Sequence, residues 1–121
     1  MAEETLKGGC MCGAVRFTAR GAPKLVANCH CRSCRKATGA AFATFVDFNR
    51  DRVTFDGAPK AHPSSPGAER LFCETCGAPI AYRGEASPDE INIYLGAFDR
   101  PETFKPSEDC HMERALWKTK R

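Results

Sequence analysis

Seven of the eight cysteines in this 121-residue chain fall into three tight clusters, and this arrangement constrains the fold more than any other feature. The clusters are Cys10-Met11-Cys12, Cys29-His30-Cys31-Arg32-Ser33-Cys34 and Cys73-Glu74-Thr75-Cys76. Two pairs complete a closed four-thiolate zinc site, and the other three cysteines form a second site with one open position. Structural zinc sites are usually closed, whereas catalytic sites keep a vacancy. The clusters therefore predict one zinc ion for folding and one for chemistry.

The cellular compartment decides whether so many thiols are expected to form disulfides or to bind metal. The N-terminal sequence Met-Ala-Glu-Glu-Thr-Leu-Lys is acidic and lacks the apolar segment of a secretory signal. No apolar run is long enough for a transmembrane helix, so no membrane partner is expected. Cysteines in a reducing compartment are more often metal ligands than disulfides. We therefore expect a cytoplasmic metal-binding protein.

The formal charge of +3 is weak evidence for nucleic-acid binding. Metal-bound cysteines are deprotonated. Seven thiolates with two zinc ions would bring the protein close to neutrality. The basic C-terminal residues 118–121 are too few to indicate more than a solvated tail. A nucleic-acid partner is therefore not expected.

The hydrophobic pattern predicts a mainly β chain that forms one domain over residues 1–121, with loose termini at 1–7 and 118–121. Alternating or apolar runs bounded by turn residues are typical of strands, and we expect them at 13–20, 24–28, 41–46, 52–55, 80–82, 91–95 and 110–117. A short helix is expected at 33–38 and should end at Gly39, because glycine readily takes positive φ there. The Pro- and Ser-rich segment 58–68 is expected to be the most mobile surface loop.

Spacing assigns the first four ligands. Residues two apart on an extended strand point to one face, so Cys10 and Cys12 can reach the same ion. Cys73 and Cys76 are three apart and precede Gly77, which is typical of a zinc knuckle. Zinc here would contribute directly to the stability of the fold. The alternative, four ordinary buried cysteines, leaves the paired spacing unexplained.

The middle cluster combines both spacings. Cys29 and Cys31 are expected to share a strand face, and Cys34 to return from the following turn. Three ligands leave room for water or a substrate thiolate. Zinc would stabilise an incoming thiol in its reactive, deprotonated form.

Three basic side chains flank this cluster: Arg32, Arg35 and Lys36. They could offset the charge of a three-thiolate zinc site or hold the carboxylates of an anionic substrate. The alternative is a solvated basic turn, since exposed Arg and Lys are ordinary.

Three further residues bear on the open position of the second zinc site. His30 lies between two ligands and should point away from the metal. Cys110 or His111 could reach the second zinc after a loop return. The alternative is a core cysteine and a surface histidine.

The motifs resemble the glutathione-dependent formaldehyde-activating (GFA) enzyme family, which also includes centromere protein V. The matching segments are 8–17, 29–36 with Thr38-Gly39, 72–80, 95–101 and Trp117. The resemblance implies a small β-tent-like fold of short antiparallel sheets. It implies a structural zinc on Cys10, Cys12, Cys73 and Cys76 and a second zinc on Cys29, Cys31 and Cys34.

The resemblance also implies an activity. The family's named reaction is carbon–sulfur bond formation and cleavage, joining glutathione and formaldehyde as S-hydroxymethylglutathione. The chain departs from the family after Pro106, where Ser-Glu-Asp-Cys-His replaces an early histidine. A zinc-dependent carbon–sulfur lyase acting on a thiol adduct is therefore the first hypothesis. The rivals are a non-enzymatic two-zinc binding module and a thiolate–zinc redox sensor.

Overall fold

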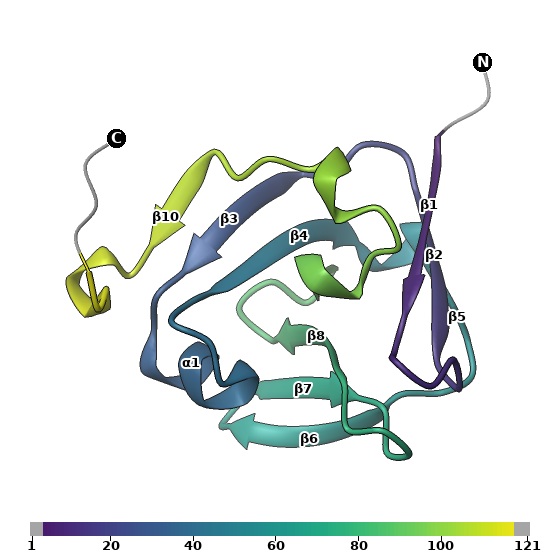
Figure 1. Ribbon diagram of the computed structural model, residues 1–121, viewed down its shortest axis with the longest axis horizontal. Helices are drawn as coiled ribbons and strands as arrows, with labels where there is room; N and C mark the ends of the chain where they lie inside the picture. Colours follow the sequence, from purple (N-terminus) through teal and green to yellow (C-terminus); the bar gives the residue numbers. More distant parts are fainter. Residues whose placement is uncertain (1–3, 118–121) are drawn as a thin grey trace.

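The computed structural model describes residues 4–117, and within them the chain is mainly β (Figure 1). The first sheet has three antiparallel strands in the order β1-β2-β5. The second has seven strands in the order β10-β3-β4-β9-β8-β7-β6. The strands are β1 Thr5–Gly9, β2 Arg16–Arg20, β3 Leu25–Cys29, β4 Ala43–Asn49, β5 Val53–Asp56, β6 Lys60–Ser65, β7 Ala68–Phe72, β8 Pro79–Gly84, β9 Glu90–Tyr94 and β10 Glu108–Cys110.

Helix is confined to α1, Arg32–Thr38, and to four 3₁₀ turns among the described residues. Cys31 caps the N-terminus of the helix, and its side chain accepts a hydrogen bond from the Cys34 amide. It ends as expected at Gly39, which has φ 71° and donates its amide to the Arg35 carbonyl. The 3₁₀ turns are Arg50–Arg52, Leu95–Ala97, Pro101–Thr103 and Met112–Arg114.

The core lies between the two sheets. Phe17 of β2 packs edge-on against Phe98 at a centroid distance of 5.1 Å, and Phe98 also contacts Phe48 of β4 at 6.3 Å. Val46 and Ile93 are fully buried on the same face of the large sheet. Successive residues of a strand point to opposite faces. The other face of the large sheet is therefore free to line a cleft.

Four details differ from the sequence-based expectations. Residues 58–68 contain the edge strand β6, because an edge strand tolerates a proline such as Pro63, which has no N–H to donate to a neighbouring strand. The last strand is Glu108–Cys110, so the strand expected at 110–117 is wrong beyond its first residue. That strand pairs parallel to β3, so the large sheet is mixed. Residues 5–7, expected to be loose, pair with β2, while 1–3 and 118–121 lie outside the described residues.

Candidate metal centres and the adjoining cleft

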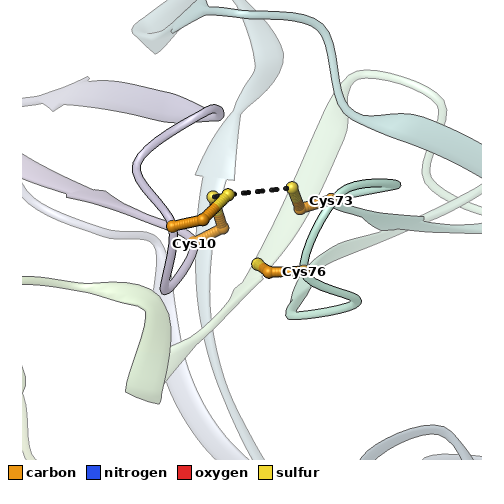
Figure 2. A group of neighbouring side chains, drawn as sticks. Cys10, Cys73 and Cys76 are labelled. Carbon is orange, nitrogen blue, oxygen red and sulfur yellow. Dashed lines mark hydrogen bonds between the residues drawn. The ribbon is translucent and has the colours of Figure 1, made fainter.

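The first cysteine cluster joins two turns that are far apart in the sequence. Cys10 and Cys12 lie on the turn between β1 and β2, and not on an extended strand as expected. Cys73 and Cys76 lie on the turn after β7, where Gly77 has φ 80°. Figure 2 shows the side chains of the two turns facing one another. All four sulfurs lie within 4.8 Å of one another.

The distances and donors of this cluster fit a tetrahedral metal ion. The Cys10–Cys12 sulfur distance is 3.6 Å and the Cys12–Cys73 distance is 3.7 Å. A tetrahedral ion with metal–sulfur bonds of about 2.3 Å requires a separation of about 3.8 Å. The Val15 amide donates to Cys10 Sγ at 3.3 Å and lowers the pKa of Cys10 to about 6. An amide that stabilises a thiolate suits a metal ligand.

The second cluster is built at the junction of β3 and α1. Cys29 ends β3, Cys31 caps α1, and Cys34 lies in the first turn of the helix. Cys29 and Cys31 therefore do not share a strand face as expected. Cys31 lies at the N-terminal cap of α1, and its sulfur approaches that of Cys29 from there. The three sulfurs lie within 4.8 Å of one another. A hydrogen bond donated by the Cys34 thiol lowers the pKa of Cys29 to about 5, and the same hydrogen bond raises the pKa of Cys34.

A cleft of about 340 Å³ adjoins the second cluster. Its floor is the face of the large sheet turned away from the core, and Cys29, Cys31 and Cys34 form part of its wall. No carboxylate within residues 4–117 adds a fourth ligand to the three sulfurs. The cluster therefore opens on a space that can hold a small molecule. The remaining lining residues are Leu25, Ala27, Ser33, Phe45, Asp47, Ser65, Arg70, Tyr82, Asn92, Cys110 and His111.

The cation of this cleft is Arg70, which the sequence analysis missed. Its Nη2 lies 3.8 Å from Cys34 Sγ, and its Nη1 donates to Tyr94 Oη at 2.7 Å. The guanidinium also lies 5.0 Å from the ring centroid of Tyr82. Burial raises the pKa of Tyr94, so its hydroxyl stays protonated at neutral pH. A sequence-based prediction of Arg70 in this cleft would have required the register in which β7 pairs with β8 and β8 pairs with β9.

The three basic residues singled out earlier do not line the cleft. Arg35 Nη1 donates to the His30 carbonyl at 3.0 Å and to the Arg114 carbonyl at 2.6 Å, so it fastens the C-terminal segment. Arg32 and Lys36 are exposed on α1. Their role as substrate contacts stays a prediction.

His30, Cys110 and His111 have distinct positions. His30 is buried and its Nε2 lies 3.0 Å from Asp109 Oδ1, away from the sulfurs as expected. Cys110 pairs with Cys29 in the parallel register of β10 and β3, and it lines the cleft without joining the cluster. His111 also lines the cleft, with the left-handed φ of 57° that non-glycine residues rarely adopt.

Comparisons with known proteins agree with this description. A family model described as "Glutathione-dependent formaldehyde-activating enzyme" matches residues 5–114. An uncharacterized lyase of Schizosaccharomyces pombe is 28% identical over 113 residues, covering 87% of this chain and 82% of the relative. A putative glutathione-dependent formaldehyde-activating enzyme of Halomonas elongata is 31% identical over 119 residues, covering 88% and 73%.

A solved structure supports the fold. The crystal structure of a Rhodobacter sphaeroides protein matches with a TM-score of 0.64 at 20% identity. The match covers 85% of this chain and 98% of that chain. At this identity the likeness concerns the fold alone. Among the described residues, no helix has the length and apolar character needed to cross a membrane.

Proposed function

Since the chain belongs to the glutathione-dependent formaldehyde-activating enzyme family, we propose that it is a zinc-dependent carbon–sulfur lyase acting on a thiol adduct such as S-hydroxymethylglutathione. The family and the lyase named among its relatives indicate an enzyme of the lyase type. One observation carries the proposal: the cluster of Cys29, Cys31 and Cys34 opens on a cleft that also holds Arg70. The substrate is a small thiol in a cytoplasmic setting, and no nucleic acid or membrane is required.

Two zinc ions have different roles in this proposal. Cys10, Cys12, Cys73 and Cys76 would hold a closed, structural ion, because four sulfurs complete its coordination. Cys29, Cys31 and Cys34 would hold the second ion with one position free. When bound there, zinc supplies a Lewis acid that keeps a substrate sulfur deprotonated.

Side chains of the protein are placed to donate hydrogen bonds to the oxygen of the adduct. In the forward direction the thiol sulfur bonds to the formaldehyde carbon, the carbonyl electron pair moves to oxygen, and that oxygen gains the proton lost by the thiol. Arg70 lies beside Cys34 and offers N–H donors on the cleft side of the cluster, while Tyr94 Oη accepts a hydrogen bond from Arg70 Nη1 and so holds the guanidinium in place. Donors already in place at an oxygen that gains charge lower the barrier of such additions. In reverse, the same donors hold the hydroxyl as the carbon–sulfur bond breaks.

The proposal is tested by measuring exchange between glutathione, formaldehyde and S-hydroxymethylglutathione by NMR, alongside zinc content. Cys34→Ser should lower the turnover at least ~100-fold, as expected for loss of the reactive ion, and remove one of two zinc ions. Cys110→Ser is the matched control, because Cys110 lines the cleft outside the cluster. It should retain both ions and near-normal turnover. Unchanged turnover in Cys34→Ser with one zinc lost would favour a binding module or a redox sensor.

A further inference from the structure

The eighth cysteine, Cys110, lies beside one sulfur of the second cluster. It ends the strand β10 and pairs directly with Cys29 of β3 in the parallel register of the two strands. The His30 amide donates to the Cys110 carbonyl at 3.0 Å, a hydrogen bond that belongs to this register. Directly registered residues present their side chains on the same face of a sheet. The two thiols therefore share one face, and both residues line the cleft.

The spacing of Cys29 and Cys110 suits a disulfide. Neighbouring strands lie about 4.8 Å apart, so the Cα atoms of a direct pair are separated by about that distance. Disulfides form across Cα separations of about 4.4–6.8 Å when the Cβ vectors do not point apart. Two side chains on one face of adjacent strands meet this condition. Rotation about the two χ1 angles can then bring the sulfurs together with little movement of the backbone.

The strand β10 can follow the small movement that remains. It has three residues and is the last strand of the large sheet, hydrogen-bonded to β3 on one side. Both cysteines are half-buried at the cleft and are not enclosed in the core. Short elements with few buried contacts open locally at low free energy. A new bond at Cys110 therefore need not disturb the core between the two sheets.

Cys110 differs from its three neighbours in what a metal ion leaves it free to do. Cys29, Cys31 and Cys34 lie within 4.8 Å of one another, and among the described residues Cys110 lies outside that group. An ion held by the three sulfurs would leave Cys110 as an uncoordinated thiol beside one ligand. An oxidisable cysteine next to a second thiol is the common arrangement of a reversible redox site, because the second thiol resolves the oxidised first one.

We propose that Cys29 and Cys110 form a reversible oxidation site, in which hydrogen peroxide joins the two sulfurs as a disulfide and displaces the ion of the second cluster. The Cys29 sulfur first attacks the peroxide O–O bond, which gives a sulfenic acid and water. The Cys110 sulfur then attacks the sulfenic sulfur, and the S–O bond breaks to release a second water. Overall the two thiols lose two electrons and two protons, which convert one hydrogen peroxide into two waters.

The disulfide would regulate the site by removing a ligand. Only a thiolate binds the metal, so oxidation of Cys29 leaves Cys31 and Cys34 as the remaining sulfurs of the cluster. In a reducing compartment a disulfide is usually transient and redox-sensing, which fits a reversible bond. The inference rests on the proposed function for its consequence alone, which is the reversible loss of lyase activity.

The experiment exposes the zinc-loaded chain to a small excess of hydrogen peroxide. Peptide mass spectrometry identifies the oxidised residues, and a zinc-binding dye measures the released ion. The wild type should form the Cys29–Cys110 disulfide and release one of two zinc ions, and a dithiol reductant with added zinc should restore both. In Cys110→Ser the oxidised Cys29 should proceed to the irreversible sulfinic acid, so the reductant should not restore the second ion.

The matched control is Ser33→Ala, which alters the cleft lining without removing a thiol. It should behave as the wild type does. A wild-type disulfide within Cys29, Cys31 and Cys34, or no disulfide at all, overturns the inference, and this reading needs no variant to fold. Equal recovery of zinc by the wild type and Cys110→Ser also overturns it, since Cys110 would then resolve nothing.

The outcomes separate this inference from the proposed function. Turnover of S-hydroxymethylglutathione by the reduced chain tests the proposed function alone and involves no oxidant. An active chain without the Cys29–Cys110 disulfide after peroxide overturns the inference and leaves the proposed function standing. An inactive chain that forms this disulfide overturns the proposed function and supports the oxidation site.

Discussion

Arg70 Nη2 lies 3.8 Å from Cys34 Sγ, so a guanidinium from β7 contacts a cysteine from α1 at the wall of the cleft. Nothing in the spacing of the cysteines anticipates this contact. Within residues 4–117 no carboxylate forms an ion pair with Arg70. The charge of Arg70 is therefore free to act on the thiolates and on a bound substrate.

The first prediction separates the charge of Arg70 from its geometry. Arg70→Met should lower kcat about 100-fold with a smaller change in KM, because the lost donors act on the developing oxyanion. Arg70→Lys keeps the charge but not the planar pair of donors, and should recover only part of the rate. Tyr94→Phe removes the acceptor that holds Arg70 Nη1 and should lower kcat about 10-fold through the position of Arg70. A rise in KM with unchanged kcat in Arg70→Met would show that Arg70 binds the ground state alone.

A second prediction concerns the pH dependence of stability. Burial raises the pKa of Asp47 to about 6 in the folded chain, whereas an unfolded aspartate titrates near about 4. The folded state then binds the proton more tightly, so the contribution of Asp47 to stability falls as pH rises from about 4 to 6. Asp47→Asn should therefore raise Tm at pH 7.5 and leave it almost unchanged below pH ~4. A lower Tm for the variant at pH 7.5 would contradict this account.

The control for this measurement is Asp56→Asn. Asp56 is exposed at the end of β5. Surface substitutions of this kind change stability by less than about 0.5 kcal/mol. Its Tm should follow the wild type at both pH values. Agreement between the two variants would trace the gain to a general charge effect and not to burial of Asp47.

Removal of the structural ion should unfold much of the chain. Cys73 is fully buried, and its cluster joins the turn after β1 to the turn after β7. Cys73→Ser should cost more than ~3 kcal/mol, because the binding free energy of a structural zinc is also folding free energy. Chelation should lower the wild-type Tm similarly. Differential scanning fluorimetry with zinc titration checks both, and a chelator-insensitive Tm would contradict the structural role.

The attachment of β10 gives a local prediction. Asp109 Oδ1 lies 3.0 Å from His30 Nε2 and 3.2 Å from Asn28 Nδ2, and both partners are buried. Asp109→Ala leaves these donors without that acceptor and should cost about 1–3 kcal/mol. Hydrogen exchange should quicken in residues 107–114 before it does in β4. Uniform acceleration across both sheets would show that the pair stabilises the whole fold.

The cysteine clusters were predictable because metal ligands close in sequence carry their geometry in their spacing. The short helix and its end at Gly39 were predictable for the same local reason. The backbone conformation at Cys10 and Cys12 was not predictable, because a turn and a strand can both bring the sulfurs of such a pair together. Sulfur convergence was thus easier to predict than the local structure that produces it.

The cleft residues could not be predicted because they meet only through strand register. Asp47 and Arg70 belong to β4 and β7, which two other strands separate in the sheet. A one-residue shift in either strand would turn its side chain to the opposite face. The segment 58–68 was misassigned for a related reason. Its prolines and serines are typical of loops, yet an edge strand with a bulge accommodates them.

The central claim is that a substrate sulfur enters the open position beside Cys29, Cys31 and Cys34. Cobalt substitution tests it directly, because added thiolate coordination alters the ligand-to-metal absorption of the ion. Addition of glutathione should increase the sulfur charge-transfer band of the dicobalt protein, whereas S-methylglutathione, which has no thiolate, should leave it unchanged. An unchanged spectrum with saturating glutathione, or the same change with both compounds, would contradict the account.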